Sequence, residues 1–475
     1  MKKIFLGLAT LAMVGSFTSC KDFLTEEPVL SQSNELTLSS YTGLNSAGAA
    51  LCYYFQSDGW FDGSYILQSE LRAGNAKNPK SEPGSGRFRG DTQWNYTASS
   101  TSGLWSYAYY TISWANNIIN NLEGKTSSEV SQQQIDNLKA EALFVRALCH
   151  FQLVITYAQP YTYQPESLGV PVILVTENGQ PARNTVKEVF DQVVEDLKEA
   201  ESLMADNYSR TGVADNAAVV SKAAIQGLLS RAYLYMGEWQ YAADYATKVI
   251  NNGKYALAEG QDYLDMFSAQ VAPAGGEIIF EVYGSQSNGG WDNSGWQHLP
   301  YITGRSALDE GSGDICATKD LYDLYEDGDI RQQLFDLVDG DYWLLKYHGK
   351  PGGVPRATNI PIIRLSEMYL NRAEAIANGA SVSGASARGD LEILAAKRGA
   401  TVPAQYSVFD ERRKELMFEG HIVYDYARCQ KSLVRTDFDD LKNKDVPFPS
   451  YMWAMPIPLR EMKANPNMVQ NEGYN

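Results

Sequence analysis

The chain contains 475 residues, with 57 acidic against 40 basic side chains and a formal net charge of −17. An acidic surface repels nucleic-acid phosphates and anionic lipid headgroups, which argues against binding to DNA or RNA. The length suffices for one large domain or two of intermediate size. The 30 Tyr and 9 Trp residues combine apolar faces with polar tips, which suits sugar recognition, although most of them are expected to fill a helical core.

The first twenty residues have the layout of an export signal. Two lysines, an apolar run over residues 4–17 and two small residues lead directly to Cys20. This layout predicts a lipoprotein signal peptide at residues 1–19, cleavage before Cys20 and lipid on its thiol. Because Phe17 is bulkier than the aliphatic residue usual at that position, an ordinary secretory signal is the alternative. No later segment has the roughly 20 apolar residues of a spanning helix, so lipid would be the only tether.

Residues 20–35 are polar and contain Pro28, which predicts an extended tether between lipid and body. The body over residues 36–475 shows helical periodicity in eight segments. Helices are expected at residues 36–56, 103–122, 131–157, 185–205, 217–236, 238–250, 363–378 and 387–399. Asn184 or Thr185 is the expected cap of the fourth helix, with Glu188 in its first turn.

Neighbouring helices can be joined into antiparallel pairs. In the clearest unit, residues 216–251, Gly237 separates two helices that carry small residues at a close-packing spacing, which resembles a tetratricopeptide hairpin. Further pairs can be drawn from residues 103–157 and 363–399. We therefore predict a mainly α fold, with one domain at residues 36–475 built on a tetratricopeptide-like helical hairpin scaffold and a few short strands. For any single pair, a generic helical hairpin is the alternative.

Two long regions, residues 57–101 and 268–315, interrupt the helical pattern. Both contain aromatic residues spaced among glycines. Loops of this length are uncommon in a compact domain unless they are functional or disordered, and disordered segments are poor in aromatics. We predict that both regions are ligand-binding loops carried by the helical scaffold.

The chemistry available to these loops is stacking on sugar rings, with hydrogen bonds to hydroxyl groups. The stacking candidates are Trp94, Trp291, Trp296 and Tyr301. The hydrogen-bonding candidates are Asp292, Asn293 and Gln297, and Arg72 and Asn75 are expected to add to the same wall. The alternative for each tryptophan is a packing role that anchors its loop.

Recognisable catalytic and metal-binding patterns are missing from the sequence. It has four His and contains no HExxH, no GxSxG and no P-loop, and its remaining cysteines show no CxxC pair. Asp327-Gly328-Asp329 before Arg331 lacks the other ligands of a calcium loop, which favours a solvated turn. A glycosidase needs only one carboxylate pair across a cleft, and the 57 acidic residues keep that function open as an alternative. No cofactor or metal is predicted, and a structural Ca²⁺ ion is left open.

Three C-terminal blocks, together with Cys20, resemble the SusD/RagB family of outer-membrane nutrient-binding lipoproteins from Bacteroidetes. The blocks are IPIIRLSEMYLNRAEA at residues 360–375, ERRKELMFEGH at residues 411–421, and PIPLREM with QNEGY at residues 456–474. The charged residues of the first two blocks are expected to form ion pairs that orient the C-terminal helices. Ile422 and Val423 depart from the residues usual after the family's Gly-His pair, as Glu472 does from a usual Pro.

The resemblance implies a capture protein that does no chemistry itself. Members of the family bind glycans, or peptides in some branches, and deliver them to a SusC-like TonB-dependent barrel transporter. It also implies a lipid-anchored protein on the outer face of the outer membrane, which agrees with the acidic stretch after Cys20. The interpretation favoured here is a glycan-binding lipoprotein. A peptide-binding member of the family is the first alternative, and a surface glycoside hydrolase is the second.

Overall fold

The computed structural model describes residues 34–81, 85–100, 103–210, 217–268, 275–284, 298–305, 311–347, 358–438 and 441–474. The predicted signal peptide, Cys20 and most of the tether lie outside these ranges.

Helices dominate the regular structure, which confirms the predicted mainly α fold with a few short strands. The longer helices are α3 Tyr41–Ala49, α4 Ser64–Ala73, α6 Leu104–Asn121, α7 Gln132–Tyr157, α8 Val186–Leu203, α9 Lys222–Met236, α10 Trp239–Ile250, α14 Leu365–Ala377, α15 Ala387–Lys397 and α16 Val408–Glu415. The shorter ones are α2 Asn34–Ser39, α5 Arg89–Thr92, α11 Gln261–Asp265, α12 Leu299–Thr303, α13 Lys319–Tyr322, α17 Ile422–Arg428, α18 Leu459–Ala464 and the 3₁₀ turns η1 Tyr53–Gln56, η2 Ile330–Leu334 and η3 Tyr451–Trp453.

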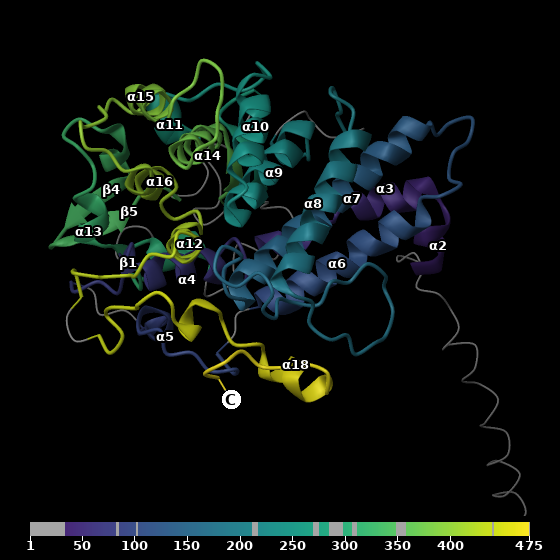
Figure 1. The fold of residues 1–475 in the computed structure, drawn as a ribbon, viewed down its shortest axis with the longest axis horizontal. Helices are drawn as coiled ribbons and strands as arrows, with labels where there is room; N and C mark the ends of the chain where they lie inside the picture. Colours follow the sequence, from purple (N-terminus) through teal and green to yellow (C-terminus); the bar gives the residue numbers. More distant parts are fainter. Residues whose placement is uncertain are drawn as a thin grey trace, which may run out of the picture.

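Successive long helices pack against one another in a continuous row. Helix α6 contacts α7, α7 contacts α8, and the series continues through α9, α10 and α14 to α15. Figure 1 shows α2, α3, α6, α7 and α8 at one end of the molecule, with α9, α10 and α14 beside them and the small sheet at the other end. Each helix buries one face against the preceding helix and another against the following one, as stacked helical hairpins do.

The helix boundaries follow the capping residues in the sequence. Thr185 caps α8, with its side chain accepting from the Glu188 N–H while the Glu188 side chain accepts from the Thr185 N–H, which confirms that expectation. Gly237 ends α9 at a φ of 75°, a conformation that glycine adopts without a steric penalty. The expected helix at residues 36–56 is wrong as one element, because Ser40 is extended and caps a new helix by accepting from the Gly43 N–H.

The strands form two small antiparallel sheets. The first has the order β1-β3-β5-β4, built from β1 Ala76–Lys77, β3 Cys316–Ala317, β5 Asp341–Leu344 and β4 Phe335–Val338. The second pairs β2 Ile278–Val282 with β6 Ile360–Arg364, with Val282 opposite Ile360. Strand β1 comes from the first predicted loop region and β3 directly follows the second, so their pairing holds the two regions together. The first region is also more regular than expected, since it contains the mostly buried helix α4.

A buried network of ion pairs joins the C-terminal blocks to the rest of the fold. The Arg364 guanidinium donates to Glu277 at 2.6 Å and to Glu415 at 2.9 Å. It also donates to Glu419 at 2.8 Å, and Arg398 closes the network by donating to Glu277 and Glu415 at 2.8 Å. Complete pairing is what allows so many charges to be buried, and such networks fix orientation more than they add stability.

The remaining charged residues of the first two blocks find partners elsewhere in the chain. The pairs are Arg231–Glu367 at 2.7 Å, Arg372–Asp390 at 2.6 Å, Arg428–Glu374 at 2.5 Å and Arg412–Asp425 at 2.9 Å. The expected ion pairs therefore form, although most of the partners lie outside the blocks. Arg413 differs, because its Nε donates to the Asn75 amide oxygen at 2.6 Å.

The predicted solvated turn is confirmed for Asp327 and Gly328, which are exposed, but it is wrong for Asp329, which is buried. Asp329 and Arg331 are both buried, and the two side chains pair at 2.7 Å. Arg331 also binds Glu411 at 2.7 Å and Glu415 at 3.0 Å. These partners are distant in sequence, and their charges permit the Asp329–Arg331 pair to be buried.

None of the helices in the described ranges is long and apolar enough to cross a membrane.

The four cysteines of those ranges are free thiols: Cys52, Cys149, Cys316 and Cys429.

Candidate ligand-binding site

The two predicted loop regions contact each other through Asp314. Its backbone carbonyl accepts from Asn78 Nδ2 at 2.9 Å, and its carboxylate accepts from the Ser85 hydroxyl at 2.8 Å and pairs with Arg87 at 3.1 Å. Three residues of the first region are thereby tied to one residue of the second. The same contacts neutralise the charge of Arg87.

Residues 53–62 lie beside the described residues that come just before and just after the segment 285–297. Ahead of that segment, Tyr283 and Tyr53 line the same cavity. After it, His298 Nδ1 lies 2.7 Å from Asp62 Oδ2, and the following Leu299 N–H donates to the Asp62 carbonyl at 2.9 Å. Burial raises the pKa of Asp62, and its hydrogen bond with His298 acts in the opposite direction.

A cluster of five rings covers the surface beside this junction. Tyr54 lies at its centre, with ring centroids 5.3 Å from Tyr53, 5.3 Å from Tyr107, 5.9 Å from Tyr110 and 5.1 Å from Trp114. Tyr53 is 50% exposed, Tyr110 48% and Trp114 36%. We call these five residues the aromatic platform. Contiguous exposed aromatic surface is unusual on a soluble domain and marks an interaction site.

The sequence places the platform by two local features. Tyr107, Tyr110 and Trp114 are separated by three and four residues on α6, so they share one face of the helix. Gly103, the cap of α6, lies so close to Tyr107 that an added Cβ would come within 2.5 Å of its ring. A Cβ added at Gly59 would likewise lie 2.9 Å from the Tyr107 ring. The missing side chains let Tyr107 lie flat against the backbone and stack on Tyr54.

A cavity of about 580 Å³ adjoins the platform at Tyr53. Its polar lining includes Gln56 and the ion pair of Glu141 with Arg210. Burial raises the pKa of Glu141 and the Arg210 charge opposes that shift. The cavity volume falls within the range of small-ligand sites. Such sites typically have mostly apolar walls with a few polar groups, as this cavity does.

Trp94, Arg72 and Asn75 are buried, which corrects the prediction that they face a ligand. Trp94 is 3% exposed, its Nε1 donates to the Arg72 carbonyl at 2.9 Å, and its ring packs against Trp453 with centroids 5.0 Å apart. Arg72 donates to the Met452 carbonyl at 3.1 Å, and Asn75 donates to Glu70 at 2.7 Å. The polar groups of Trp94 and Asn75 are hydrogen-bonded inside the fold, so the packing alternative holds for Trp94.

Tyr301 is half-buried on α12, and its carbonyl accepts from the Ser312 N–H at 2.7 Å. It therefore stays a candidate at the edge of the second region. The other predicted residues lie outside the described ranges: Trp291, Asp292, Asn293, Trp296 and Gln297. Their roles remain predictions.

The aromatic platform is absent from the sequence-based predictions. Tyr107, Tyr110 and Trp114 fall in the helix expected at residues 103–122, and most aromatic residues of the chain are expected to fill the helical core. The usable signal was their spacing, because helical aromatics at intervals of three and four on the polar face have no core to fill.

Metal chemistry gains no support from the described residues, among which no group of three or more His, Cys, Asp or Glu side chains could hold an ion.

Two family models match this chain. One, described as starch-binding and associating with the outer membrane, matches residues 29–234, and the other, described as the SusD family, matches residues 339–474. The chain belongs to the SusD family. The aromatic platform of this SusD-family protein lies within the first matched range, and the buried ion network lies mostly within the second.

Relatives and solved structures agree with this membership. The protein is 24% identical to SusD-like protein P2 of Formosa agariphila, over 80% of this chain and 83% of the relative. It is 25% identical to the starch-binding protein SusD of Bacteroides thetaiotaomicron, over 80% of each chain.

A putative sugar binding protein from Bacteroides vulgatus superposes with a TM-score of 0.81 at 29% identity, over 92% of this chain and 99% of that chain. A laminarin binding SusD-like protein shares the fold with a TM-score of 0.72 at 24% identity, over 92% of this chain and all of that one.

Proposed function

We propose that this protein is a cell-surface glycan-binding lipoprotein that captures oligosaccharides without cleaving them and delivers them to a SusC-like TonB-dependent transporter. The observation that carries the proposal is the aromatic platform in a member of the SusD family. The ligand would lie across Tyr110 and Trp114, and the predicted roles of Trp291 and Trp296 remain part of the proposal.

The chemistry of the platform suits a sugar. A pyranose ring has an apolar C–H face that packs on an aromatic ring, and its hydroxyl groups can bond the phenol groups at the ring edges. Gln56 and Asp58 lie half-buried next to the platform and offer further hydrogen-bonding groups. Rings already stacked on one another lose little conformational freedom on binding, which reduces the entropic cost of association.

The charge distribution favours a neutral oligosaccharide. The whole chain is acidic, and Arg87 of the first loop region is engaged by Asp314. A polyanionic glycan would meet repulsion over most of the surface.

The proposed location also rests on the family. The family model that matches residues 29–234 describes association with the outer membrane. We propose that lipid on Cys20 anchors the protein there and that residues 20–35 hold the body above the membrane, facing the cell exterior and the mouth of the transporter.

Calorimetry tests the proposal on the unlipidated chain that begins at Lys21. A panel of neutral oligosaccharides, including starch- and laminarin-derived ones, is titrated in parallel with peptides. We expect saturable binding of at least one oligosaccharide and no increase in reducing ends during prolonged incubation. Release of reducing ends would point to a glycoside hydrolase, and binding of peptides alone would point to a peptide-binding member of the family.

A further inference from the structure

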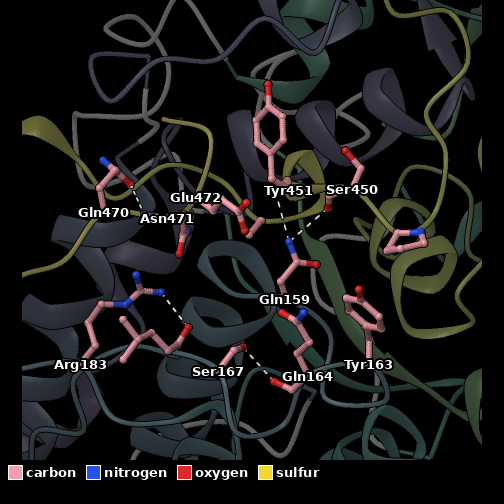
Figure 2. A pocket seen from close by; sticks show the side chains of 13 residues that line it. Gln159, Tyr163, Gln164, Ser167, Arg183, Ser450, Tyr451, Gln470, Asn471 and Glu472 are labelled. Atoms are coloured by element: carbon pink, nitrogen blue, oxygen red, sulfur yellow. Dashed lines mark hydrogen bonds between the residues drawn. The ribbon is translucent and has the colours of Figure 1, made fainter. Parts of the chain in front are cut away.

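A second concave site lies between the connector after α7 and the C-terminal segment (Figure 2). It is a pocket of about 380 Å³, which we call the C-terminal pocket, and the lining residues that matter here are Gln159, Tyr163, Arg183, Tyr451, Asn471 and Glu472. It shares no lining residue with the aromatic platform or its adjoining cavity. The volume is near the lower end of the range for small-ligand sites, which suits one or two sugar rings.

Hydrogen bonds between distant parts of the chain fix the walls of the pocket. Gln159 Nε2 donates to the carbonyls of Ser450 and Tyr451 at 3.2 and 3.3 Å (Figure 2). Asn471 Nδ2 donates to the carbonyls of Tyr157 and Met455 at 2.8 and 2.7 Å. The pocket is therefore formed before any ligand arrives, so binding would require little ordering of the protein.

Two half-exposed rings are held at the pocket by edge contacts. Tyr163 is 37% exposed and packs at 74° to Phe448, with ring centroids 5.1 Å apart. Tyr451 is 43% exposed and packs at 79° to Tyr474, with centroids 5.2 Å apart. An edge contact with a neighbour holds each ring in place without covering both of its faces.

The polar groups of the pocket offer both donors and acceptors. Gln159 Oε1 is buried at the wall and accepts no hydrogen bond from the described residues, a state that a bound hydroxyl or water relieves. Arg183 donates to four backbone carbonyls and has no carboxylate partner in the described ranges, and burial lowers its pKa to about 10. Glu472 adds one negative charge to the same lining. A pocket lined by one positive charge, one negative charge and amide groups suits a neutral ligand rich in hydroxyl groups better than an ion.

We infer that the C-terminal pocket is a second carbohydrate-binding site, which takes a short neutral saccharide independently of the aromatic platform. The inference rests on the proposed function, in that it assumes the protein binds glycans. Two separate sites would let one protein hold a branched or long glycan at two points, which raises the overall affinity through effective concentration.

Neutral disaccharides test this inference, with maltose, cellobiose and laminaribiose titrated by ligand-detected NMR. The pocket variants are Tyr163→Ala and Glu472→Gln, both at solvent-accessible positions, and the platform variant is Trp114→Ala. We expect Tyr163→Ala to weaken disaccharide binding about tenfold, Glu472→Gln to weaken it in the same direction, and Trp114→Ala to leave it unchanged.

Three results would overturn the inference. In the first, a disaccharide binds and neither pocket variant changes its affinity. In the second, only Trp114→Ala removes binding, which would assign disaccharides to the platform. In the third, longer oligosaccharides bind the unmodified protein but no disaccharide does. These results leave the proposed function intact, whereas the absence of binding to saccharides of any length would overturn both.

Discussion

Replacement of Trp114 by alanine removes the largest exposed ring of the aromatic platform. Trp114 is 36% exposed, which for a side chain of roughly 250 Å² leaves about 90 Å² for a ligand to cover. At about 25 cal/mol per Å², covering that area contributes about 2 kcal/mol. The dissociation constant for the bound oligosaccharide should therefore rise roughly 30-fold.

Calorimetric titration of Trp114→Ala against the best oligosaccharide of the panel measures this change. The matched control is Tyr241→Ala on α10, since Tyr241 is 52% exposed, packs on a neighbouring tyrosine and lies outside the platform. The control should bind as the unmodified protein does, and circular dichroism should show both variants folded. Equal affinity of Trp114→Ala and the unmodified protein would refute the assignment of the platform as the glycan site.

Three further predictions concern anchoring and stability. Cys20→Ser should release the protein from the membrane fraction and abolish labelling with radioactive palmitate, whereas Cys429→Ser, which changes a free thiol of the body, should do neither. Arg364→Met should lower the free energy of unfolding in urea by about 3–5 kcal/mol, because it leaves buried carboxylates without their cation, and a loss below 1 kcal/mol would contradict the network's role. Burial raises the pKa of Glu70 from 4.5 to about 7, so the folded state holds a proton that the unfolded state releases, and stability should fall as pH rises from 4.5 to 7. Glu70→Gln should flatten that decline, and an unchanged pH profile would show that Glu70 is ionised in the fold.

The helical scaffold could be predicted because its signals are local. Helix α7 was expected at residues 131–157 and spans Gln132–Tyr157, since its periodicity and its Ser131 cap both lie in one continuous stretch. Thr185 and Glu188 likewise form their capping box within four residues. The break at Ser40 was not predicted, because a serine within an apolar periodic pattern is compatible both with a helix interior and with the cap of a new helix.

The site was harder to predict because it depends on contacts between distant segments. Trp94 has the same glycine-rich surroundings as the predicted stacking residues, but its packing partner Trp453 is more than 350 positions away. The platform brings Tyr54 of a short 3₁₀ turn against Tyr107 and Trp114 of α6, a contact between separate elements that local sequence patterns do not show. Burial of Asp329 is a further example, since its neutralising partner Arg331 is itself held by residues of α16.

A crystal structure of the protein with a bound oligosaccharide is the most direct test of the proposed glycan capture. We expect an intact glycan with its sugar rings stacked over Tyr110 and Trp114. A cleaved glycan, or a ligand bound on a surface away from the platform, would contradict this expectation.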